Sequence, residues 1–148
     1  MSKLRNVNLD VASFAMECVE NIKKSDSEFI DQDKYKTLVK KMPTLIQKNG
    51  FIGTLVFNLS KIDKNYHKET LKNIIEWNIR NDKINNIKNI KEKVGNKYNN
   101  KTITDYVEWV TSLKPREYRL ITKEMMNLFG WIKRFADGMI EGEECNGG

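Results

Sequence analysis

The chain has 148 residues and carries 26 Lys and Arg against 20 Asp and Glu, so its formal net charge is +6. This length suits one domain with a real hydrophobic core, and no apolar run approaches the roughly 20 residues that a membrane-spanning helix needs. A positive charge admits a polyanionic partner without requiring one, because a sequence rich in Lys, Asn and Ile gains charge from its composition alone. Only the placement of the charges is therefore informative.

The first predicted helix runs over residues 8–24. Its apolar residues recur at steps of three and four, which is typical of one buried stripe. They are Val7, Val11, Phe14, Ala15, Cys18, Val19 and Ile22. Asn8 or Asp10 is the expected N-cap. Because Cys18 falls in this stripe and Cys145 in a Gly-rich tail, we expect two free thiols, no disulfide and no metal site, in a cytoplasmic protein without a signal peptide.

A second helix follows the polar segment 25–33. Its buried stripe consists of Tyr35, Leu38, Val39, Met42 and Ile46. Pro43 lies inside this helix and should kink or divide it, because proline removes one backbone hydrogen bond. Asn49 and Gly50 predict a stop, with the glycine in the left-handed conformation. A third helix over residues 51–61 has a thin polar face, which predicts a central position.

A fourth helix is predicted over residues 64–80. Its apolar residues are Leu71, Ile74, Ile75 and Ile79, with Trp77 on a flank. His67 is the only histidine of the chain. Its sequence neighbours supply no carboxylate or thiol cluster, so we expect a surface or capping histidine and no catalytic or metal-binding role.

Residues 81–101 differ in composition, because Asn, Lys and Ile dominate and Gly95 interrupts them. We interpret this segment as an elaborated, partly mobile connection within one domain. The spacing of Ile84, Ile87, Lys88 and Lys91 predicts at most a weak helix. Thr102 and Asp105 have the spacing of a capping box and predict the start of a fifth helix. The buried residues of that helix are Ile103, Tyr106, Val107, Val110 and Leu113.

The last predicted helix is long and covers residues 114–141. Pro115 suits its first turn, where the missing amide has no partner in any case. Its apolar stripe consists of Tyr118, Ile121, Met125, Leu128, Ile132, Phe135 and Met139. Residues 142–148 are expected to be a frayed tail. With no period-two alternation, the chain is predicted to be all α, a single compact bundle of about five to six helices forming one domain over residues 1–148.

A basic face opposes the apolar stripe of this long helix. At about 100° per residue it carries Arg116, Arg119, Lys123 and Arg134. Arginine suits bidentate phosphate contacts, and Gly130 on the same side costs about 1 kcal/mol in a helix interior, which implies a packing reason or a close approach. Six basic side chains, Lys133 included, stand against two acidic ones over residues 114–134, a balance of +4. The alternative is an ordinary solvated face.

No sequence motif for an active site or a cofactor is present. The chain lacks a Gly-rich phosphate loop, a zinc-protease helix and a nucleophile elbow. We therefore expect no enzyme, no cofactor and no small-molecule substrate. The alternative, a catalytic domain, would need a site assembled from residues that are distant in sequence. The three tryptophans are expected in the core or at an interface in preference to base stacking, and Trp131 lies at the edge of its stripe, where a partner's surface would cover it.

Three segments, taken together, resemble a known family. The matching residues are Ala15 to Val19, then Tyr35-Lys36 through Val39-Lys40-Lys41-Met42-Pro43 to Ile46-Gln47-Lys48-Asn49-Gly50, and finally Tyr118-Arg119 to Trp131-Ile132-Lys133-Arg134-Phe135-Ala136, ending near Met139. In this order they are similar to the first, second and last helices of the small subunit of the type III-B (Cmr) CRISPR effector complex. Asp10 and Val11 stand where that family leads one to expect a basic residue before Ala12.

The resemblance implies an all-helical, non-catalytic subunit that is present in several copies. The copies stack on each other and on the backbone subunits that hold the guide RNA, and together they line a basic channel for target RNA. The candidate nucleic-acid-binding residues are Arg116, Arg119, Lys123, Lys133, Arg134, Lys40, Lys41 and Lys48. The implied partners are other Cmr subunits, copies of the chain itself, guide RNA and target RNA, with no membrane. The alternative is a helical adaptor that bridges protein subunits without touching nucleic acid.

Overall fold

A computed structural model describes residues 2–24, 30–85, 87, 90–94 and 99–141. Within these residues the fold is all helical and contains no strand, which confirms the predicted class. The helices are α1 (Ser2–Lys24), α2 (Gln32–Leu59), α3 (Asn65–Arg80), α4 (Asp82–Asn85), α5 (Ile90–Val94), α6 (Asn100–Thr111) and α7 (Pro115–Met139).

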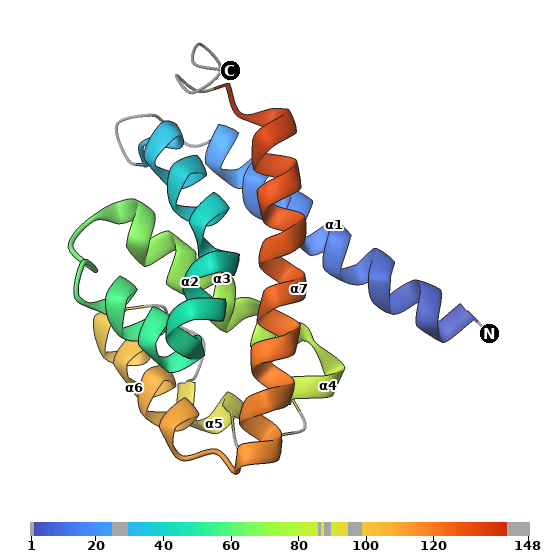
Figure 1. Cartoon of the computed structure of the whole chain (residues 1–148), viewed down its shortest axis with the longest axis vertical. Helices are drawn as coiled ribbons and strands as arrows, with labels where there is room; N and C mark the ends of the chain where they lie inside the picture. The colour runs from blue at the N-terminus through green and yellow to red at the C-terminus, as the bar shows by residue number, and fades with distance from the viewer. Residues whose placement is uncertain (1, 25–29, 86, 88–89, 95–98, 142–148) are drawn as a thin grey trace.

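The long helix α7 packs along both α1 and α2, and α2 packs in turn on α3 (Figure 1). Helix α6 contacts α2, α3 and α5. The N-terminal part of α1 extends away from the other helices, while its C-terminal part crosses α7 (Figure 1).

Helix α7 begins and ends close to the predicted positions. Pro115 occupies its first turn, and the carboxylate of Glu117 accepts a hydrogen bond from the backbone N–H of Lys114 at 3.0 Å. The centre of the predicted stripe is buried, namely Ile121, Met125, Leu128 and Ile132. The 3.6-residue period of the apolar residues therefore fixes both the existence and the orientation of this helix.

Helix α2 joins the second and third predicted helices. Asp31 caps it, since its carboxylate accepts a hydrogen bond from the N–H of Lys34 at 3.1 Å. Backbone angles stay helical through Pro43, so the helix is not divided there. The break lies at Gly50, whose φ of +77° and ψ of 166° interrupt the helix. The stop predicted at Asn49 and Gly50 is thus confirmed as a break, after which the helix resumes.

Two predicted helix starts are wrong. Helix α1 begins at Ser2, because the residues before Asn8 contain no Gly or Pro that would end it, so neither Asn8 nor Asp10 is its cap. Helix α6 is capped by Asn99, whose side-chain oxygen accepts from the N–H of Thr102 at 2.8 Å. Asparagine is at least as good an N-cap as threonine, and it sits one turn earlier.

The segment after α3 is more closely integrated than predicted. It forms the short helices α4 and α5, and Ile84, Ile87, Ile90 and Val94 are buried in the core. The side chain of Lys91 and the tail from residue 142 lie outside the described residues. Cys145 belongs to that tail, whereas Cys18 is a free, buried cysteine as expected, and burial raises the pKa of its thiol well above its usual range.

Three buried polar side chains of the core are paired across helices. The hydroxyl of Tyr35 donates to the side-chain oxygen of Asn73 at 2.7 Å, and Tyr106 donates to Asn78 at 2.8 Å. Burial raises the pKa of both tyrosines. The ammonium of Lys36, only 1% exposed, donates to the carbonyl oxygen of Ile140 at 2.7 Å. Such pairs avoid the cost of burying a polar group without a partner.

Candidate nucleic-acid interface

The outer face of α7 carries the basic residues that were predicted to lie there. Arg116, Arg119, Lys123, Lys133 and Arg134 are all exposed. None of them forms an ion pair within the described part of the chain. Because none of these cations is held in a close ion pair, this face attracts anions.

Arg134 is positioned by an aromatic pair at the edge of the core. Its guanidinium lies 5.1 Å from the ring centroid of Trp131, and that ring stacks on Phe135 at 6.1 Å. Trp131 is half-buried and packs against the core. A cation over an indole face is favourable by about 0.5–1 kcal/mol at an exposed site. The pair therefore holds one arginine of the outer face in place.

Gly130 lies on the same outer face. A Cβ atom built there would meet nothing within 4 Å apart from its own chain neighbours and helix backbone. The described part of the chain therefore gives no packing reason for a glycine in this helix interior. The sequence analysis gave two explanations for this glycine, a packing reason or the close approach of another molecule, and the second is still to be tested.

The three candidate lysines of α2 have different environments. Lys40 is half-buried, and its ammonium lies 2.9 Å from the Asp137 carboxylate on α7. This hydrogen bond lowers the pKa of Asp137. Lys41 and Lys48 are exposed. Lys40 thus joins α2 to α7, and Lys41 and Lys48 are the more accessible of the three candidate lysines.

Lys41 lies in a groove of about 330 Å³ between α2 and α3, which we call the lysine groove. Its lining residues are Lys34, Thr37, Leu38, Lys41, Phe57, Lys61, Lys64, Tyr66 and His67. The lining therefore contains four lysines and no acidic side chain. The ammonium of Lys34 lies 5.9 Å from the ring centroid of Tyr66, and that of Lys61 lies 5.8 Å from the ring of Phe57.

His67 is buried in the wall of this groove, so the prediction that it is a surface or capping histidine is wrong. It is 4% exposed, and its Nδ1 lies 2.8 Å from the side-chain oxygen of Asn58. Asn58 donates its own amide to the carbonyl of Thr54, so Nδ1 of the neutral imidazole carries the proton. Burial, and then the charges of Lys61 and Lys64, lower the pKa of His67. The histidine is buried because the start of α3 packs on the end of α2.

The sequence alone pointed to Lys41 but missed the rest of the lysine groove. Its other cations lie at the start of α2, after its end and at the cap of α3. Only the packing of α2 on α3 brings these residues together. The sequence does place Phe57 and Tyr66 close to several lysines, and this pattern could have indicated the groove. Aromatic rings among cations are typical of surfaces that bind single-stranded nucleic acid.

A family model described as CRISPR-associated protein (Cas_Cmr5) matches residues 7–139, which is most of the chain. The match includes both the outer face of α7 and the lysine groove. In the part of the chain that the structure describes, no three His, Cys, Asp or Glu side chains gather so as to hold a metal ion. None of the described helices combines the length and apolar character needed to cross a membrane.

Proposed function

The chain belongs to the Cas_Cmr5 family, the small subunits of the type III-B (Cmr) CRISPR effector complex, and we propose that it lines the channel in which that complex holds target RNA. The observation that carries this proposal is the outer face of α7, whose five exposed cations have no ion-pair partner among the described residues. Contacts from Lys and Arg to phosphates carry no base identity. They suit a subunit that must accept any target, because pairing with the guide supplies the specificity.

The lysine groove supports the same function from a second side. Its four lysines can neutralise phosphates, and Phe57, 37% exposed, and Tyr66 offer aromatic surface to unstacked bases. Stacking on an aromatic side chain contributes about 1–3 kcal/mol per base in single-strand binding. The groove would therefore hold a short single-stranded stretch with little preference for sequence.

Within the complex we assign the subunit a structural, non-catalytic role in the cytoplasm. Family membership implies association with other Cmr subunits. Stacking between copies of the chain, and contact with the backbone subunits that hold the guide RNA, complete the proposal. Cleavage of the target is assigned to the backbone subunit.

The test is to assemble complexes in which Arg116, Arg119, Lys123 and Arg134 are changed to Glu. The core should be unaffected, because these side chains point away from it. A plot of log affinity against log salt concentration has a negative slope, and each lost phosphate contact should make it less steep by roughly one unit. Binding should weaken about equally for all target sequences. A matched control changes Lys23 and Lys24, exposed at the end of α1, to Glu.

Two other outcomes would contradict the proposal. Poor incorporation of the subunit, with unchanged RNA binding by the remaining complex, would make the outer face of α7 a protein interface and favour the adaptor. Normal incorporation with an unchanged salt slope would mean that this face is only solvated.

A further inference from the structure

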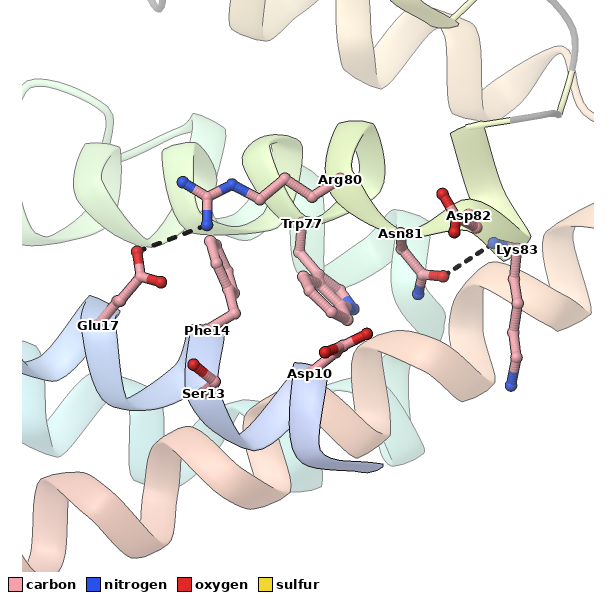
Figure 2. A pocket seen from close by; sticks show the side chains of 9 residues that line it. All are labelled: Asp10, Ser13, Phe14, Glu17, Trp77, Arg80, Asn81, Asp82 and Lys83. Carbon is pink, nitrogen blue, oxygen red and sulfur yellow. Dashed lines mark hydrogen bonds and ion pairs between the residues drawn. The ribbon is translucent and has the colours of Figure 1, made fainter. Parts of the chain in front are cut away.

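A pocket of about 330 Å³ opens between the middle of α1 and the C-terminal end of α3 (Figure 2). We call it the α1–α3 pocket. Its lining residues are Asp10, Ser13, Phe14, Glu17, Trp77, Arg80, Asn81, Asp82 and Lys83. None of them belongs to the outer face of α7 or to the lysine groove.

Trp77 lines this pocket and carries a buried hydrogen-bond donor that has no acceptor among the described residues. Its side chain is 6% exposed and stacks on Phe14 with 5.1 Å between ring centroids. The indole Nε1 is buried and has no hydrogen-bond partner within the described part of the chain. Figure 2 shows the indole directed into the space between α1 and α3, where the Asp10 carboxylate also lies. Because buried donors are nearly always satisfied, this N–H requires an acceptor oxygen that the described residues do not supply.

The cations of the α1–α3 pocket are already paired within the chain. The guanidinium of Arg80 lies 2.8 Å from the Glu76 carboxylate and 3.4 Å from that of Glu17. The ammonium of Lys83 lies 3.5 Å from Glu124. Asp10, in contrast, is exposed and has no ion pair among the described residues. Three carboxylates stand against two cations in the lining, a net charge of −1, which disfavours the phosphates of RNA and favours a basic ligand.

Helix α1, which forms one wall of the α1–α3 pocket, also exposes apolar side chains that do not line the pocket. Leu9, directly before Asp10, is 62% exposed, and Met16, directly before Glu17, is 40% exposed. Leu9 and Met16 are seven residues apart and so share a face of α1, and large apolar side chains exposed together are typical of surfaces that another protein covers. Methionine in particular adapts to the shape of a partner.

We propose that the α1–α3 pocket receives a basic segment of a neighbouring protein subunit. A carbonyl oxygen of that segment accepts the hydrogen bond from Trp77 Nε1, and a Lys or Arg side chain of the same segment pairs with Asp10. Leu9 and Met16 pack against its apolar atoms. This inference uses the membership of the chain in a multisubunit complex and does not depend on the proposed RNA contacts.

The first test measures the affinity of the full-length subunit for an immobilised Cmr complex assembled without it. Asp10→Lys places like charges together and should weaken binding about tenfold or more, whereas Asp10→Asn should weaken it by several-fold. Glu92→Lys, at an exposed residue of α5 outside the pocket, makes the same change in charge and serves as the matched control. Equal affinities for Asp10→Lys and Glu92→Lys would overturn the proposal.

Trp77→Phe keeps an aromatic ring on Phe14 but removes the N–H. Losing a donor that has no partner among the described residues should weaken binding to the immobilised complex by roughly fivefold. Circular dichroism and the melting temperature show whether the variant is folded. If it is not, the Asp10 variants and the crosslinking test below decide the question.

The second test identifies the occupant. A photoreactive p-benzoylphenylalanine replaces Ser13, which is exposed in the free subunit, and the fully assembled complex with RNA is irradiated. The expected adduct is with a Lys- or Arg-containing peptide of a different Cmr subunit, the kind of partner that the first test presents. An adduct with a second copy of the chain would contradict the proposal. An adduct with RNA, or no adduct in a complex that has incorporated the variant, would contradict a protein ligand. Failure of the RNA proposal would leave this result unchanged.

Discussion

The backbone N–H of Ile52 donates a hydrogen bond to the phenolic oxygen of Tyr118, with 3.0 Å between the two atoms. This contact joins α2, two residues after its break, to the first turns of α7. The first amides of a helical segment have no acceptor in that segment, and Tyr118 supplies one from the neighbouring helix. The break at Gly50 and the position of α7 therefore stabilise each other.

Tyr118→Phe should lower the free energy of unfolding by about 1–2 kcal/mol, because it leaves the amide of Ile52 without its acceptor in a partly buried position. Urea denaturation followed by circular dichroism measures the change. Tyr66→Phe is the control, since the Tyr66 hydroxyl makes no hydrogen bond among the described residues, and a loss of similar size there would argue against the Ile52 contact.

Gly50→Ala and Gly138→Ala should have opposite effects on stability. At φ +77° a Cβ atom is strained, so Gly50→Ala should destabilise the protein by about 1–2 kcal/mol. Gly138 lies inside α7, and a Cβ there meets nothing within 4 Å, so Gly138→Ala should stabilise by about 0.5–1 kcal/mol. Thermal unfolding of the two variants side by side decides this, and shifts of the same sign would contradict the assignment.

The stability of the subunit should fall as the pH drops below about 6.5, the ordinary pKa of histidine. The pKa of His67 is lowered in the folded protein, so the unfolded chain binds a proton first and is favoured as the pH falls. The contribution of neutral His67 to the free energy of unfolding is fully present above about pH 6.5. It decreases as the pH falls from there to below the lowered pKa. His67→Gln should flatten this part of the curve, and an unchanged curve would show that the histidine does not cause it.

Single-stranded RNA in the lysine groove should raise the pKa of His67 towards its ordinary value. Burial and then the charges of Lys61 and Lys64 lower this pKa in the free subunit, and the bound phosphates would offset the charges of the two lysines. His67 is the only histidine, so a pH titration by NMR with a short oligouridine follows a single imidazole. In the double variant Lys41→Gln, Lys64→Gln the oligouridine should bind more weakly, and binding that leaves the His67 titration unaltered would place the RNA elsewhere.

Helix α7 was predictable because Pro115 marks its start and its apolar residues keep a helical period for more than 20 residues. The segment after α3 was harder to predict. Its Ile84, Ile87 and Ile90 also follow steps of three, but Asn and Lys surround them, and the composition suggested a loose connection. Burial of these isoleucines depends on partners from other helices, which local sequence does not reveal.

The candidate site was predictable only where it lies on one helix. Arg116, Arg119 and Arg134 share a face of α7 by spacing alone, and their exposure agrees with that expectation. The lysine groove combines α2, α3 and the turn between them, so its positions are set by tertiary packing. The burial of His67 has the same origin, because its acceptor Asn58 comes from α2.

The hydrogen bond between Lys36 and Ile140 sets a limit on how far the chain can be shortened. Ile140 directly follows the last residue of α7, and its carbonyl is the backbone acceptor for an ammonium in the core. A stop codon after Glu141 retains this acceptor, whereas one after Met139 removes it and brings a new terminal carboxylate to the place. Expression vectors that trim or tag this end should therefore keep Ile140 and Glu141.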